Sequence, residues 1–189
     1  MTVPILLASS SERRKQLLNL INIRVDQYFS PEVDETPLKD ELPRQLALRL
    51  ANLKADVAAE QFPDHIIIAA DNVVGCGRRV LDKAETDDDV RRYLTLLSGR
   101  KNTVYCALAM RHPSGKRSIK LVETKVAFKR LTDQEIESYV ETGEGIGKAA
   151  GYAIQGIASK YVKWMQGSFH ATVGLPVHEV YQVLSGWGT

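Results

Sequence analysis

Hydrophobic residues along the chain occur either in uninterrupted runs or at helical spacing, and the two patterns alternate. Continuous apolar runs at 3–8 and 65–71 are typical of strands buried on both faces, and the second run ends in Asp71. Apolar residues three or four positions apart predict helices over 11–20, from Pro43 onward and over 86–98. The first half of the chain therefore has the strand and helix alternation that builds parallel sheets.

The second half carries antiparallel signals. Two β-rich segments, 103–111 and 117–128, flank the turn sequence HPSG and predict a hairpin. Thr132 and Glu135 form a capping-box pattern for a helix that ends near Gly143. Weaker signals predict a strand over 23–29, a short strand pair over 157–173 and a final helix over 176–184. The expected fold is α/β, with a mixed, partly antiparallel sheet flanked by helices, in one domain spanning residues 1–189.

Composition narrows the class of protein. The 189 residues are 44% hydrophobic with a formal net charge of +2, which suits one sizeable core and a compact anionic ligand but not nucleic acid. The opening apolar run is too short for a signal peptide and no window suggests a membrane span, so we expect a soluble, cytoplasmic protein. Cys76 and Cys106 stand alone in apolar stretches and are interpreted as reduced core residues, and the four histidines lack zinc-site spacing.

The stretch LLASSSERRKQLL, residues 6–18, follows the first predicted strand and opens a helix. Small serines, here Ser9 to Ser11, let phosphate oxygens approach the free N–H groups of a helix start. Arg13 and Arg14 add planar cationic forks that match phosphate geometry. The segment is therefore a candidate phosphate cradle. The competing interpretation is a serine N-cap followed by two solvated arginines.

Acidic and basic residues at other strand ends supply further candidates. Asp71 follows a buried run, where its carboxylate could accept a proton from water or hold a divalent metal, or merely cap a turn. Glu35, next to Asp34 in the loop PEVDETP, is a second possible metal ligand. Lysines could neutralise a polyphosphate, although a single lysine is usually a solvated surface group. The lysines considered are Lys54, Lys83 and Lys148.

Several short motifs in fixed order resemble one family, the Maf-like nucleoside triphosphate pyrophosphatases, once described as septum-formation inhibitors. They are LLASSSERR, EVDETP, RLANLKA, AADNVV, LSGR, TKVAFKRLTDQEIESYVETGE, KAAGYAIQG and GSFHATVGLP. The resemblance implies a mixed sheet with a deep cleft, hydrolysis of a nucleoside triphosphate to the monophosphate and pyrophosphate, a divalent cation such as Mg²⁺ or Mn²⁺, and a homodimer. It implies that Asp71 is the proton acceptor, that Ser9 belongs to the phosphate loop and that Arg14, Glu35, Lys54 and Lys83 are polar active-site residues.

Three positions are implied to select the base, namely Arg13, Asn72 and Gln155. The branch of the family that acts on dTTP and UTP has Arg, Thr and Gln there, whereas the branch that acts on 7-methyl-GTP has Trp, Gln and Glu. A glutamine amide can pair with the O4/N3 edge of uracil or thymine. Two of the three residues thus favour pyrimidine triphosphates, while Asn72 leaves CTP or a modified pyrimidine open.

The chain departs from the pattern of the family at three places. Glu12 and Ala84 each replace a proline, and Lys101-Asn102 stand where a histidine is common after LSGR. At the first helical turn we expect Glu12 to point to solvent and to interact favourably with the helix dipole. The expected enzyme uses Asp71 to orient or deprotonate water, Glu35 to help hold metal and the basic residues to offset phosphate charge. Two alternatives are a 7-methyl-GTP or other modified-purine pyrophosphatase, and a nucleotide-binding regulator of cell division that does not hydrolyse its ligand.

Overall fold

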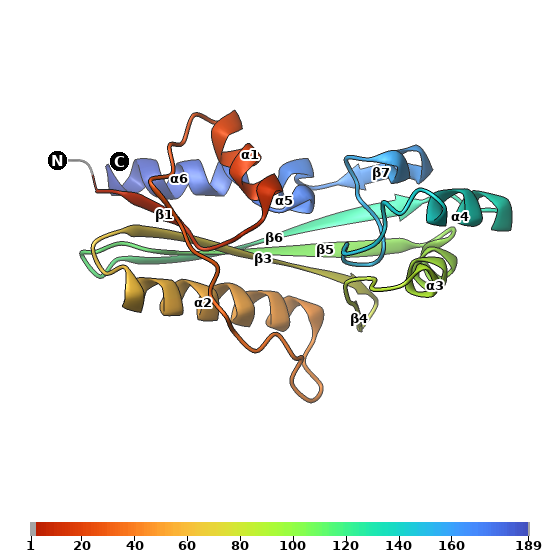
Figure 1. Ribbon diagram of the computed structural model, residues 1–189, viewed down its shortest axis with the longest axis horizontal. Helices are drawn as coiled ribbons and strands as arrows, with labels where there is room; N and C mark the ends of the chain where they lie inside the picture. The colour runs from red at the N-terminus through yellow and green to blue at the C-terminus, as the bar shows by residue number, and fades with distance from the viewer. Residues whose placement is uncertain (1–2, 189) are drawn as a thin grey trace.

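The computed structural model describes residues 3–188 and shows a mixed sheet with helices on both faces (Figure 1). Its strands are β1 (Ile5–Leu7), β2 (Gln27–Tyr28), β3 (Ile66–Cys76), β4 (Arg79–Leu81), β5 (Lys101–Arg111), β6 (Arg117–Phe128) and β7 (Val162–Gln166). Its helices are α1 (Glu12–Leu20), α2 (Pro43–Gln61), α3 (Asp87–Leu97), α4 (Asp133–Val140), α5 (Phe169–Val173), α6 (Val177–Trp187) and a 3₁₀ helix, η1 (Ile157–Tyr161). No helix in the described range is long and apolar enough to cross a membrane.

The strand order is β2-β1-β3-β5-β6-β7, with β4 pairing to β3 outside this path. β1 runs parallel to both β2 and β3, whereas β3, β5, β6 and β7 pair with one another in antiparallel fashion. The predicted mixed sheet and the predicted hairpin, now β5 and β6, are therefore confirmed.

One side of β3 has interrupted pairing. β1 pairs with Ile66 to Ile68, and β4 pairs with Val74 to Cys76. Within the described chain no strand pairs with residues 69–73 on that side, while β5 pairs without a break from Ile67 to Gly75 on the other. The sheet thus has a gap at the carboxyl end of β1, which is where ligands collect in open α/β sheets.

Alternating residues of β3 face two different helical layers. Ile67 and Ala69 pack with the buried stripe of α2 on one face, and Ile68 and Ala70 pack against α1 and α6 on the other (Figure 1). Because strand side chains alternate between faces, the neighbours Asp71 and Asn72 also point to opposite sides of the sheet. Two successive residues can therefore serve two different groups of partners.

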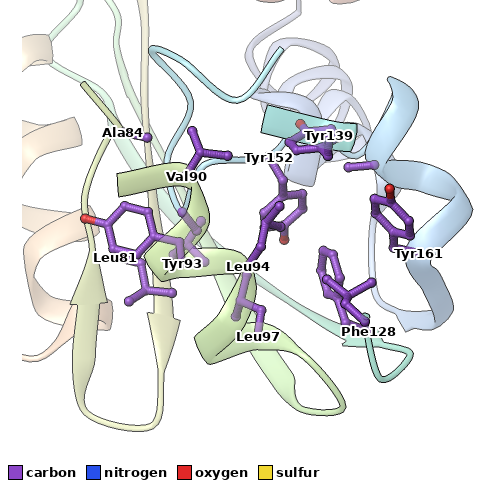
Figure 2. Close-up of a cluster of buried hydrophobic side chains, with 14 of the residues drawn as sticks. Leu81, Ala84, Val90, Tyr93, Leu94, Leu97, Phe128, Tyr139, Tyr152 and Tyr161 are labelled. Atoms are coloured by element: carbon purple, nitrogen blue, oxygen red, sulfur yellow. The ribbon is translucent and has the colours of Figure 1, made fainter. Parts of the chain in front are cut away.

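A third cluster of buried side chains lies where α3 and α4 cover the far end of the sheet (Figure 2). Leu94 and Leu97 of α3 belong to it, together with Tyr139 of α4 and Tyr152 from the segment between α4 and η1. The Tyr152 hydroxyl donates to Asn102 Oδ1 at 3.0 Å, and its ring meets Phe128 edge-on at a centroid distance of 5.0 Å. This cluster fixes the segment that forms one wall of the cleft described below.

Several predicted bounds and one predicted element type are wrong. Asp71 does not end its strand, because β3 continues to Cys76 before turning at Gly77, which has a φ of +61°. The predicted strand pair over 157–173 is instead η1, the single strand β7 and helix α5. The strand expected over 23–29 contains only Gln27 and Tyr28, and the final helix continues to Trp187.

Candidate active site

A cleft of about 680 Å³ opens at the gap in the sheet. One part of its lining comes from residues 8–11, the first turn of α1 and both faces of β3. The rest includes the loop that carries Glu35, Lys54 of α2, Lys83 and the segments 147–155 and 172–174. Every residue proposed from the sequence for catalysis or binding lies in this lining: Ser9, Arg13, Arg14, Glu35, Lys54, Asp71, Asn72, Lys83 and Gln155. Asp34 does not line the cleft; it is exposed, and its Oδ1 accepts from the Thr36 amide at 2.9 Å.

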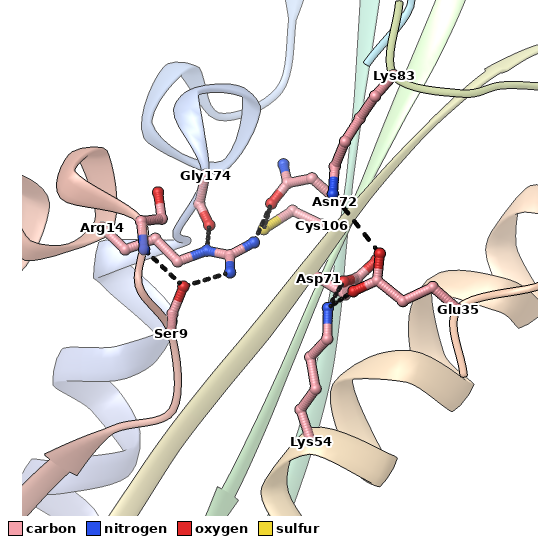
Figure 3. Close-up of polar contacts among 10 residues, drawn as sticks. Ser9, Arg14, Glu35, Lys54, Asp71, Asn72, Lys83, Cys106 and Gly174 are labelled. Atoms are coloured by element: carbon pink, nitrogen blue, oxygen red, sulfur yellow. Dashed lines mark hydrogen bonds and ion pairs between the residues drawn. The ribbon is translucent and has the colours of Figure 1, made fainter. Parts of the chain in front are cut away.

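Arg14 is held in a fixed orientation on the first wall (Figure 3). Its Nε donates to the carbonyl of Gly174 at 2.9 Å, and its Nη1 donates to Ser9 Oγ at 3.0 Å. Ser9 Oγ also accepts from the Ser11 amide at 3.2 Å, so the hydroxyl hydrogen of this buried serine remains available to a ligand. A guanidinium and a hydroxyl are thereby presented together, as phosphate binding requires.

The start of α1 supports the cradle interpretation over the simple N-cap. Ser11 occupies the N-cap position, but its side chain makes no capping hydrogen bond. Arg13 is partly buried and has no ion-pair partner in the described part of the chain, and burial together with the charge of Arg14 lowers its pKa. The Glu12 side chain is 69% exposed, as expected, and pairs with Lys15 at 3.2 Å, although the residue also contributes to the rim of the cleft.

Asp71 and three other charged residues form an alternating chain on the α2 side of β3 (Figure 3). Lys54 Nζ, from α2, lies 2.5 Å from Asp71 Oδ1 and 2.5 Å from Glu35 Oε1. Lys83 Nζ lies 3.6 Å from Glu35 Oε2. Burial acts to raise the pKa of Glu35, but the hydrogen bonds and charges of Lys54 and Lys83 outweigh it and lower that pKa. The Glu35 carboxylate is therefore anionic near neutral pH.

Asn72 points to the opposite face and connects the first wall to α5. Its Nδ2 donates to the carbonyl of Ala171 at 2.7 Å, while its Oδ1 accepts from Arg14 at 3.5 Å and from the Cys106 thiol at 3.4 Å. Burial raises the pKa of Cys106 to about 12, so it remains a protonated thiol. The amide expected to contact the base is thus largely committed to neighbours within the protein.

The remaining wall is the segment 147–155, which presents Lys148 and the exposed side chain of Gln155. Ala84 N donates to the carbonyl of Lys148 at 3.0 Å, a hydrogen bond that a proline at position 84 could not make. Farther along, Glu144 accepts from the amides of Ile157 at 2.9 Å and Ala158 at 3.3 Å and caps η1. These contacts hold Gln155 at the rim of the cleft.

Sequence reasoning did not find the residue that anchors the Glu35 loop. Arg49 of α2 donates through Nε and Nη2 to Glu41 at 2.8 and 2.9 Å, and through Nη2 to the carbonyl of Thr36 at 2.9 Å. Arg49 lies four positions after Gln45 on the predicted helix, and nothing in the local pattern relates it to the loop. Only the fold brings the two together.

The donor set fits a divalent cation that is shared with a ligand. Two hard carboxylate oxygens, from Glu35 and Asp71, converge on one positive group, the ammonium of Lys54. No group of three or more His, Cys, Asp or Glu side chains that could hold a metal occurs among the described residues. Mg²⁺ commonly takes one or two carboxylates and completes its shell with water and substrate phosphates, so the pair suits it.

Comparison with known proteins gives concordant matches. A family model described as Maf-like protein matches residues 4–187. The chain is 48% identical over 184 residues to a dTTP/UTP pyrophosphatase of Caulobacter vibrioides, covering 97% of this chain and 95% of that protein. It is 43% identical over 183 residues to a nucleoside triphosphate pyrophosphatase of Anaplasma marginale, covering 97% and 93%. A HAM1 protein structure from Coxiella burnetii shares the fold, with a TM-score of 0.55, 16% identity and coverage of 98% and 100%.

Proposed function

This chain belongs to the Maf-like protein family, and from that premise we propose that it is a pyrophosphatase that hydrolyses the pyrimidine nucleoside triphosphates dTTP and UTP to the monophosphate and pyrophosphate. One observation in the structure carries the proposal. The phosphate-binding groups at the start of α1 and the charged chain around Asp71 face a single cleft of about 680 Å³, which is within the usual range for small-molecule sites.

The cationic side chains of the cleft suit a polyphosphate. Arg13, Arg14 and the hydroxyl of Ser9 meet phosphate oxygens on one side, and Lys83 and Lys148 meet them on the other. Preorganised donors of this kind stabilise charge that develops as the bond between the α-phosphorus and the bridging oxygen breaks. Pyrophosphate then leaves with that bridging oxygen.

Asp71 is the proposed proton acceptor. Its carboxylate is mostly buried and fixed by Lys54, so it can orient a water molecule toward the α-phosphorus and take its proton. Glu35 and Asp71 are the proposed metal ligands. A bound Mg²⁺ or Mn²⁺ would supply Lewis-acid polarisation of the phosphate oxygens.

Gln155 is the proposed base-reading residue. Its exposed amide can donate to and accept from the O4/N3 edge of uracil or thymine. Asn72 has fewer free hydrogen-bonding positions, since Ala171, Arg14 and Cys106 occupy most of them. Base selection therefore rests more on Gln155 than on Asn72.

The test is pyrophosphate release from a panel of triphosphates: UTP, dTTP, CTP, 7-methyl-GTP and ITP, each with Mg²⁺, Mn²⁺ or a chelator. UTP and dTTP are expected to be the best substrates and the chelator to abolish release. Preference for 7-methyl-GTP would move the enzyme to the other branch of the family. Tight UTP binding without pyrophosphate release would identify a regulator instead.

Under the same proposal the enzyme is a cytoplasmic, single-domain homodimer, which cell fractionation and sedimentation velocity would test.

A further inference from the structure

We infer that Lys54 is a built-in counter-ion that keeps free divalent cations away from the Glu35 and Asp71 carboxylates, so that the metal enters the cleft together with the nucleotide. The inference rests on the proposed function and concerns the order in which its two ligands bind. It is carried by the position of one ammonium group, which lies where the carboxylate oxygens converge (Figure 3).

The geometry leaves little room for a second cation between these carboxylates. Lys54 Nζ contacts Glu35 Oε1 and Asp71 Oδ1 at the same distance of 2.5 Å. The Lys54 and Asp71 side chains are only 12% and 10% exposed, so the ion pair is shielded from solvent and is weakly screened. A metal ion bound to both oxygens must therefore displace the ammonium.

A displaced ammonium loses both of the acidic partners that it has in this structure. Glu35 and Asp71 are the acidic partners of Lys54 among the described residues, and the metal would have taken both. The cleft lining holds five lysines and arginines against three carboxylates, so added positive charge is unfavourable there. A free divalent cation thus has to compete with the Lys54 ammonium and to enter a cleft whose lining carries excess positive charge.

A nucleotide chelate removes both obstacles. Its triphosphate brings oxygens that can accept from Lys54 once the ammonium leaves the carboxylates, and its negative charge offsets the cationic lining. Each ligand then favours binding of the other, and by linkage the effect is reciprocal. Lys54 thereby serves as a counter-ion of the carboxylates before the nucleotide binds, and as a hydrogen-bond donor to the phosphate oxygens afterwards.

The test measures Mn²⁺ binding from the electron paramagnetic resonance signal of free Mn²⁺, without nucleotide. The wild-type protein is expected to bind Mn²⁺ weakly, and Lys54→Gln to bind it about tenfold more tightly or better, the order expected when one adjacent like charge is removed. Lys54→Met, which keeps the length of the side chain, should behave in the same way. With α,β-methylene-UTP, which cannot be cleaved at the reacting bond, the wild type should lower the free Mn²⁺ signal below that of Mn²⁺ with the nucleotide alone, because the nucleotide itself chelates the ion.

Lys83→Gln is the matched control, because this lysine also faces Glu35 but at 3.6 Å and with a side chain 69% exposed. Its effect on Mn²⁺ affinity should stay below about fivefold, since solvent screens exposed charges. The gain in Mn²⁺ affinity of Lys54→Gln should disappear in the double variant that also carries Glu35→Gln. Thermal unfolding verifies that each variant is folded.

Equal Mn²⁺ affinity in the wild type and both Lys54 variants would overturn the inference, as would a gain that survives loss of Glu35. Pyrophosphate release from UTP is measured on the same wild-type preparation. Its absence would refute the proposed function, whereas normal release with equal Mn²⁺ affinities would refute only the role given to Lys54.

Discussion

Replacing Asp71 by Asn separates the chemistry of the cleft from the stability of the fold. The amide has nearly the shape of the carboxylate and keeps one oxygen that can accept from Lys54. In the wild type, Lys54 Nζ lies 2.5 Å from Asp71 Oδ1. What the substitution removes is the negative charge and the capacity to take a proton from water. We therefore expect a folded protein that binds nucleotide and turns over very slowly.

The structure sets the sizes of the two effects. Removing one partner of a buried ion pair can cost about 3–5 kcal/mol, but Lys54 retains Glu35 at 2.5 Å and is not left uncompensated. The expected loss of stability is nearer that of a charged hydrogen bond, about 1–3 kcal/mol, which lowers Tm by less than about 12 °C in a chain of this size. Loss of a general base lowers kcat by about 10² to 10⁴.

The assay is a coupled measurement of pyrophosphate release from UTP, alongside thermal unfolding and calorimetric binding of α,β-methylene-UTP. Asp64→Asn is the control, because Asp64 is exposed and lies outside the cleft lining, and it should retain the wild-type rate. Undiminished turnover in Asp71→Asn would refute the role of Asp71 as proton acceptor. A variant that is unfolded at the assay temperature would refute the stability estimate.

Three further predictions address the supports of the cleft. In Gly156→Ala the new Cβ would overlap Glu144 Oε1 and displace the carboxylate that caps η1, so Tm should fall by a few degrees and KM for UTP should rise. An unchanged melting curve and KM would contradict this. Arg49→Lys cannot keep the paired hydrogen bonds to Glu41, so the loop carrying Glu35 should become more sensitive to proteolysis. The Mn²⁺ concentration needed for half-maximal turnover should also rise. Equal digestion rates in the wild type and the variant would count against the role of Arg49 in holding this loop. Burial raises the pKa of Cys106, so above the ordinary thiol pKa of 9.0 the folded state still holds a proton that the unfolded state releases. The stability of the wild type relative to Cys106→Ser should therefore decline as the pH rises from 9 toward 12. Urea titrations at several pH values measure this difference in stability, which would not change with pH if the thiol were accessible.

Local patterns predicted the elements that depend on local signals. Unbroken apolar runs predicted the starts of β1 and β3, and the Thr132 and Glu135 pair predicted the start of α4, where each side chain does bond the backbone of the other. The resemblance to one family, carried by short motifs in fixed order, indicated residues that the fold collects in one cleft. These successes share short range in sequence or a family motif.

Predictions failed where a distant residue decides the conformation. Residues 157–161 begin and end with the β-favouring Ile157 and Tyr161, yet Glu144 from thirteen positions earlier caps the first two amides and the segment forms η1. The extension of β3 beyond Asp71 depends on pairing with both β4 and β5, which no local pattern reports. The anchoring of the Glu35 loop by Arg49 likewise spans separate elements. Non-local pairing and capping override propensity at such sites.

The two sides of β3 differ in how continuously the strand is paired. The nine residue pairs with β5 run unbroken from Ile67 to Gly75, whereas β1 and β4 each contribute three pairs to the opposite side. The segment 147–155, which carries Gln155 and takes no part in this pairing, can consequently be changed while the long ladder stays intact. A redesign aimed at a different nucleobase would therefore graft new segments beside residues 69–73 and leave the backbone of the scaffold alone.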